Sequence, residues 1–216
     1  MSGMIRHLQG FTRARDGSVM VEFTIIVSLL LTVTGGMVDF SLALYQWNAA
    51  AKAVELGGRI AAVSSPVASN LATYVPVSGF PTAFSVVCSG ATGTCTGGGT
   101  YDATAMQTIV FGQGKSTCGA VAAGQLPAMC DAFPALTTSN VKVTYQQSAY
   151  ATSGLGYSGR KLPVPTISVE TTGLTFSFFF LNALLGLAPM TIPLMTTTIT
   201  SEDLSSNCGG TGQPAC

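Results

Sequence analysis

The sequence predicts an α+β fold: a long N-terminal helix, first transmembrane and then amphipathic, followed by a small, mainly antiparallel β-sheet domain with disulfides. Three observations predict this fold. An apolar run of membrane length lies near the amino terminus, helical spacing of apolar residues continues beyond it, and alternating β-branched segments and six cysteines follow later. We therefore expect a cytoplasmic leader at 1–17, the helix at 18–63 and an extracytoplasmic α+β domain at 64–216.

Length and charge limit the functions that the chain can have. Its 216 residues suffice for one membrane element and one compact domain. Charged residues make up only 8% of the chain, and nine Lys and Arg are balanced by nine Asp and Glu. Because a nucleic-acid surface needs an excess of basic side chains, we do not expect a nucleic-acid partner.

The amino-terminal apolar run has the length of a membrane span. Residues 19–38 would form a helix of about 30 Å, which matches the hydrocarbon core of a bilayer. Glu22 is the only charged residue from position 18 to position 38, and Arg6, Arg13 and Arg15 precede the run. The positive-inside rule therefore predicts a cytoplasmic amino terminus and an extracytoplasmic carboxy-terminal part. A secretory signal peptide would have a shorter apolar segment with an A-x-A-like cleavage site.

The helix is predicted to continue as an amphipathic element until the serines before Pro66. From 18 to 63 it would be about 69 Å long. The expected apolar stripe is Val38, Leu42, Tyr45, Ala49, Ala53, Leu56, Ile60 and Val63, and the polar stripe is Ser41, Asn48, Lys52, Glu55 and Arg59. Glu55 and Arg59 stand four residues apart, as in a helical ion pair. The glycines at 35–36 are interpreted either as a bend or as a site of close helix packing.

Glu22 is the residue in the span that most needs an explanation. A carboxylate left unpaired near the bilayer centre costs about 2.5–3.5 kcal/mol, so a partner is expected. The pattern of Gly17, four residues and then Glu22 and Phe23 resembles the type IV pilin superfamily. The resemblance implies that a prepilin peptidase cuts after Gly17 and that Ser18 becomes the N-methylated terminus. The Glu22 carboxylate would then neutralise the terminal ammonium of a neighbouring subunit.

Three segments narrow this resemblance. They are the run 16–23, the acidic-aromatic Val38-Asp39-Phe40, and the small-residue-rich helix end at 53–62. Together they resemble the TadE-like pseudopilin family of tight-adherence (Flp-type) pilus systems. The helix end departs from the family order by an extra glycine.

The TadE-like resemblance implies a non-enzymatic minor pilin or pseudopilin that is required for pilus assembly. Its implied partners are the prepilin peptidase, other pseudopilins, the major pilin, the inner-membrane assembly platform and the lipid bilayer. The implied location is the bacterial inner membrane, with a single pass and a periplasmic domain, or a surface pilus that incorporates the subunit. An uncleaved signal-anchored periplasmic scaffold or binding module stays open as the alternative.

The cysteines all lie in the predicted extracytoplasmic part. We expect disulfides rather than a metal site, because the sequence has no C-x-x-C pair and its only histidine, His7, lies in the leader. Six cysteines permit fifteen connectivities. Nearest-neighbour pairing is the simplest of them and gives Cys88 with Cys95, Cys118 with Cys130, and Cys208 with Cys216.

The carboxy-terminal part shows strand-like alternation at 141–145 and 167–171, and a third strand is expected around 191–200. The segment 106–111 fits either a helix or a strand. The glycine-rich segment 89–100 is predicted to be a flexible loop.

The run at 174–187 is strongly apolar but has only about 14 residues, which is too short for a second span. We interpret it as a core segment or a subunit contact. Its aromatic cluster, which includes Phe179 and Phe180, fits interior packing or an exposed assembly surface, and exposure of these two rings would favour assembly.

No pattern of catalytic residues is present in the sequence. The segment 112–116 ends like a phosphate-binding loop, but Ile109 stands where that pattern requires glycine. Triads that use histidine are unavailable outside the leader. Glu202 and Asp203 are interpreted as a solvated strand end, and cation binding there stays open as the alternative. We therefore expect no enzyme activity, no catalytic residue, no cofactor and no metal.

Overall fold

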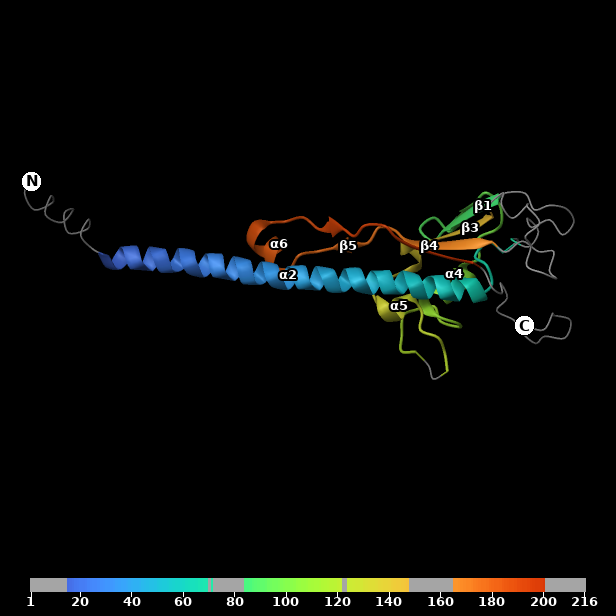
Figure 1. The fold of residues 1–216 in the computed structure, drawn as a ribbon, viewed down its shortest axis with the longest axis horizontal. Helices are drawn as coiled ribbons and strands as arrows, with labels where there is room; N and C mark the ends of the chain where they lie inside the picture. The colour runs from blue at the N-terminus through green and yellow to red at the C-terminus, as the bar shows by residue number, and fades with distance from the viewer. Residues whose placement is uncertain (1–14, 70, 72–83, 122–123, 148–164, 201–216) are drawn as a thin grey trace, which may run out of the picture. The chain divides into compact units, whose positions relative to one another are not determined.

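The computed structural model describes residues 15–69, 71, 84–121, 124–147 and 165–200 (Figure 1). The helices are α2 (Arg15–Val63), α4 (Ala103–Phe111), α5 (Met129–Ala132), the 3-10 helix η1 (Thr138–Asn140) and α6 (Phe180–Leu185). The strands are β1 (Phe84–Ser89), β2 (Thr94–Thr96), β3 (Val141–Gln147), β4 (Thr166–Thr171), β5 (Thr175–Phe176), β6 (Met190–Thr191) and β7 (Met195–Thr200). The predicted α+β class is confirmed.

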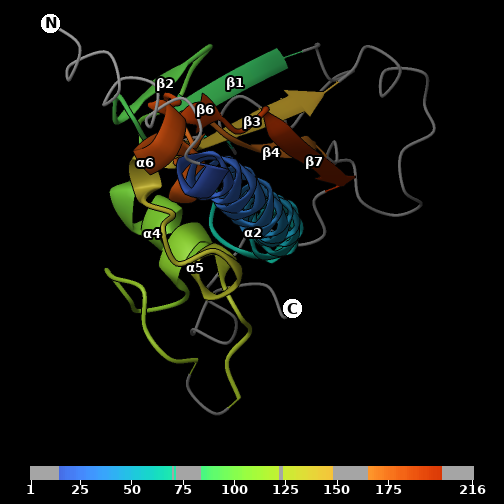
Figure 2. The ribbon, with the colours of Figure 1, turned by 90° about the vertical axis from the view of Figure 1, so that its left-hand side faces the viewer.

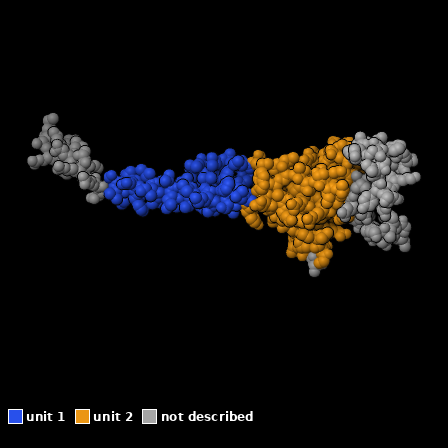
Figure 3. Space-filling view, viewed as in Figure 1, with its two compact units in different colours: residues 1–44, 176–190 blue, residues 45–175, 191–216 orange. Residues whose placement is uncertain are grey.

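The chain forms two compact units, which Figure 3 colours separately. Unit 1 comprises residues 1–44 and 176–190, and unit 2 comprises residues 45–175 and 191–216. The proposed boundaries of leader, helix and domain stay a prediction.

Unit 2 is built on a five-stranded antiparallel sheet with the order β2-β1-β3-β4-β7. Alternate residues of β4 are buried, as the sequence pattern predicts for a strand with one face in a core. On the other face, Lys142 and Glu170 are register partners on β3 and β4 and form a cross-strand salt bridge. This alternation gives the sheet one apolar face, and the carboxy-terminal part of α2 packs on it.

Within unit 2, α2 lies between the sheet and the pair α4 and α5 (Figure 2). Two consecutive glycines make this two-sided packing possible. A Cβ at Gly57 would lie 2.5 Å from the Met129 sulfur of α5, and one at Gly58 would lie 2.6 Å from Cγ2 of Thr197 on β7. A Cβ at either position would overlap a neighbouring side chain, so the sheet and α5 both approach the helix backbone closely.

A hydrogen bond connects the segment after α2 to the sheet. The helix ends at Val63, as Pro66 predicts, and the Val67 N–H then donates a 2.9 Å hydrogen bond to the hydroxyl of Tyr145 on β3. Tyr145 is fully buried. Burial raises the pKa of Tyr145 well above its ordinary value and outweighs the opposing effect of the Val67 N–H.

Several local expectations are settled by the structure. The segment 106–111 belongs to helix α4, whose first turn is capped by the Asp102 side chain. The expected flexible loop at 89–100 contains strand β2, because its backbone pairs with β1. Glu55 forms its ion pair with Lys52, at 2.9 Å, rather than with Arg59.

The expected apolar stripe of α2 is only partly right. Ala53 and Ile60 are buried, but Leu42 and Tyr45 are exposed. Most of the buried residues that the stripe missed are small, namely Ala50, Gly57, Gly58, Ala61 and Ala62, and Val54 is the larger one among them. Small side chains are buried there because unit 2 packs against two faces of the helix instead of one.

Candidate functional site

The predicted processing and assembly residues lie in the first turns of α2. Gly17, Ser18, Glu22 and Phe23 are all helical and exposed, and Phe23 is 64% exposed. A Cβ added at Gly17 would meet no atom within 4 Å among the described residues. Ser18 and Glu22 stand four residues apart, so both lie on one face of the helix.

Among the described residues, α2 is the one helix long and apolar enough to cross a membrane. Its large apolar side chains are exposed along the predicted span, including Val21, Ile26 and Leu30. A buried core helix would instead cover such side chains with protein. The helix is therefore compatible with a single-pass membrane anchor.

Hydroxyl groups inside the predicted span are satisfied by the helix itself. Thr24, Ser28 and Thr32 donate to backbone carbonyls three or four residues earlier, over 2.7–2.9 Å. Thr34 does the same. These hydroxyls need no water or protein partner inside a bilayer.

Glu22 differs from these hydroxyls. Within the described residues its carboxylate has no hydrogen-bond donor and no cation beside it. A charged group in an apolar span requires a partner, and the described part of the chain supplies none.

A second polar group of unit 1 is fully satisfied. Asp39 is 0% exposed, and its Oδ1 accepts hydrogen bonds from the backbone N–H groups of Phe179 (3.0 Å) and Phe180 (3.3 Å). Its Oδ2 accepts from the N–H of Leu181 at 2.8 Å. One carboxylate thus caps the amino-terminal turn of α6, which has no capping side chain of its own.

The glycines before Asp39 let α6 approach α2. A Cβ at Gly35 would lie 2.9 Å from Cβ of Phe180, whereas one at Gly36 would lie at an ordinary 3.7 Å from Leu181. Both glycines are helical, and the short distance at Gly35 supports the close-packing interpretation at that position.

The apolar run at 174–187 divides between burial and exposure. Phe176 is buried and packs edge-on against Phe178, with ring centroids 4.9 Å apart. Phe179 is 71% exposed and Leu185 is 61% exposed. The interior-packing interpretation therefore holds for Phe176 and is wrong for Phe179.

Two disulfides lie in unit 2, Cys88–Cys95 between β1 and β2 and Cys118–Cys130 at α5. The third expected pair, Cys208 and Cys216, lies outside the described residues, as do Glu202 and Asp203. That pair stays a prediction.

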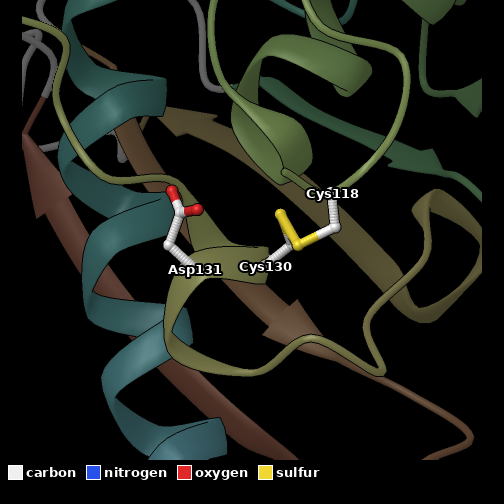
Figure 4. Close-up of side chains that lie close together, drawn as sticks. All are labelled: Cys118, Cys130 and Asp131. Carbon is white, nitrogen blue, oxygen red and sulfur yellow. A yellow bond between two sulfur atoms is a disulfide. The ribbon is translucent and has the colours of Figure 1, made fainter. Parts of the chain in front are cut away.

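One group of described residues has the composition of a metal site. The ligand atoms of Cys118, Cys130 and Asp131 lie within 4.8 Å of one another (Figure 4). The two sulfurs form a disulfide and are not thiolates, and the Asp131 carboxylate accepts the Ala128 N–H at 2.6 Å. Metal ions bind cysteine as the thiolate, which a disulfide does not provide. In its oxidised form this group is therefore a disulfide-linked turn.

The roles of Gly17, Ser18, Glu22 and Phe23 stay predictions, and the sequence does not reveal the role of Asp39 as a helix cap. Asp39 was noted only as part of an acidic-aromatic pair. A usable signal was the aromatic start of α6 at 178–180, which has no Ser, Thr, Asp or Asn at its N-cap position and so needs a cap from elsewhere.

These features define a chain with a membrane-length amino-terminal helix, an acid near its start that has no partner among the described residues, and a disulfide-bearing α+β unit. A protein-family model described as TadE-like protein matches residues 17–59. The match confirms the TadE-like resemblance of the amino-terminal helix. Comparisons with curated proteins and with solved structures give no match.

Proposed function

We propose that the chain is a pseudopilin-like structural subunit of a tight-adherence pilus system, cut by a prepilin peptidase after Gly17 and required for pilus assembly. The observation that carries the proposal is Glu22, an exposed carboxylate in a membrane-length apolar helix with no partner in the described residues. The match of residues 17–59 to the TadE-like protein family supports it.

The proposed mechanism uses charge pairing to set the register between subunits. Cleavage after Gly17 creates an ammonium at Ser18, which is N-methylated in the mature subunit. In a lateral array of helices, the Glu22 carboxylate of one subunit pairs with this ammonium on a neighbour displaced along the axis. Both charges lose water in the bilayer, so each requires the other.

The proposed location is the bacterial inner membrane, with the leader in the cytoplasm and the α+β domain in the periplasm. The proposed partners are the peptidase, other pseudopilins, the major pilin and the assembly platform. The two disulfides of unit 2 support an oxidising compartment for that unit.

Replacement of Glu22 tests the proposed pairing. We expect Glu22→Ala to be processed normally but to lose co-purification with other pilus subunits and to lose pilus assembly. Ser28→Ala is the matched control, because the Ser28 hydroxyl lies in the same span and bonds only to the Ile25 carbonyl. A processed Glu22→Ala protein that assembles as well as the native one would refute the charge-paired register and favour an anchored scaffold.

A further inference from the structure

Unit 1 contains a second apolar feature besides the predicted span. We call residues 176–190 the apolar lobe; it holds α6 together with one residue of each strand β5 and β6. Its exposed large apolar side chains are Phe179, Phe180, Leu184, Leu185, Leu187 and Met190. Such a surface is rarely left in contact with water.

The lobe is attached at the end of the predicted span. Asp39, which accepts three of its N–H groups, directly follows the span, and Gly35, which contacts Phe180, lies in the last turn. Positions 35 and 39 are separated by about 6 Å along the helix axis. Whatever surrounds the end of the span in the membrane therefore also surrounds the lobe.

The chemistry of the lobe fits an apolar environment. No charged residue occurs between Glu170 and Glu202, so the lobe carries no charge to be desolvated. Asp39 also accepts the backbone N–H groups at the first turn of α6. The last turn closes on Gly186, whose N–H donates to the Asn182 carbonyl at 2.8 Å.

We propose that the apolar lobe is a second membrane contact that inserts Phe179, Leu184 and Leu185 into the outer leaflet beside the end of the α2 span. This inference rests on the proposed membrane insertion of α2. The lobe would act as a stop that fixes how far α2 sits in the bilayer. An uncharged surface of this kind binds through apolar burial, so anionic lipid is not required.

Tryptophan quenching by brominated lipids tests the proposal on the full chain. Trp47 is the only tryptophan, so Trp47→Phe provides a silent background. In it, Leu185→Trp reports on the lobe, Ile26→Trp on the span, and Leu126→Trp on an exposed apolar position of unit 2. Each protein is reconstituted in phosphatidylcholine vesicles brominated either near the headgroup or near the chain ends.

We expect the lobe tryptophan to lose fluorescence mainly to shallow bromine, the span tryptophan mainly to deep bromine, and the unit 2 tryptophan to neither. An unquenched lobe with a quenched span would overturn the lobe proposal and leave the anchor intact. An unquenched span would overturn both. A lobe protected from lipid and from aqueous acrylamide alike would instead assign it to contact with another subunit. Leu184→Trp repeats the test if the first lobe variant fails to fold.

Discussion

The Asp39 carboxylate connects two segments that are 140 residues apart in the sequence. It replaces the capping side chain that α6 lacks, and it is buried by the contact that it makes. A carboxylate that accepts three N–H groups at a helix start is favoured both by hydrogen bonding and by the helix dipole. Its removal would leave those donors without an acceptor.

We expect Asp39→Ala to open the apolar lobe. Three part-buried N–H donors lose their acceptor, which costs about 1–3 kcal/mol and speeds local exchange about 5- to 150-fold. Hydrogen exchange of the amides of 179–181 measures this directly. Asp39→Asn keeps one acceptor oxygen and should give a smaller effect. Unchanged exchange in the alanine variant would show that the cap does not hold the lobe.

Gly35 and Gly36 form a matched pair of substitutions one residue apart. Gly35→Ala places a Cβ against Cβ of Phe180, which cannot turn away, and overpacking of this kind costs about 1–3 kcal/mol. Gly36→Ala meets only an ordinary contact and gains about 1 kcal/mol of helix propensity. Exchange of the α6 amides should rise in the first variant and not in the second. Equal behaviour of the two would contradict close packing at Gly35.

The sequence makes Glu22 a candidate functional residue but gives no sign of the cap that Asp39 forms, and the reason is physical. A charged residue inside an apolar run can be recognised from the sequence alone, because the free-energy cost of burying its charge in the membrane depends only on the run around it. The value of Asp39 depends on a helix start far along the chain. Pairing between such distant positions cannot be read from local pattern, and only the three-dimensional structure brings them together.

At the scale of elements, the side chains that α2 exposes and buries differ in size between the two units. Along the predicted span its large side chains are exposed, whereas in unit 2 it presents alanines and glycines to the sheet and to α5. Small residues allow two neighbours to approach one helix. The close contact between Gly58 and Thr197 of β7 is one example of this close approach. It can be tested by substituting these two residues alone.

We expect Gly58→Ala to lower the free energy of unfolding of unit 2 by about 1–3 kcal/mol, since its Cβ would overlap Cγ2 of Thr197. Thr197→Ser removes that methyl group while keeping the hydroxyl. The double variant should therefore recover most of the loss. Thermal unfolding followed by near-ultraviolet circular dichroism, in detergent, provides the measurement. Failure of the serine to rescue would show that the helix–sheet contact is not what limits stability.

Elements with strong periodicity could be predicted from the sequence, and those set by tertiary contacts could not. Strands β3 and β4 alternate cleanly, and α2 ends where Pro66 requires. Strand β2 lies in a glycine-rich segment whose local preference is a loop, and its pairing with β1 overrides that preference. The predicted stripe of α2 is too narrow, because a single apolar stripe assumes one buried face and unit 2 packs against two faces of the helix.

At the scale of the whole molecule, the TadE-like match covers only the amino-terminal helix of the chain. The family model ends at residue 59, within α2, while most of unit 2 follows it. The proposals of processing and lateral pairing therefore rest on the amino-terminal helix. The α+β unit is held by its own core and disulfides.

The central claim is that the chain is cut between Gly17 and Ser18 before α2 pairs with its neighbours. Intact mass spectrometry of the protein purified from membranes of cells that contain a prepilin peptidase tests it most directly. We predict a chain that begins at an N-methylated Ser18 in these cells and at Met1 in cells without the peptidase. A chain that still begins at Met1 when the peptidase is present would contradict the account.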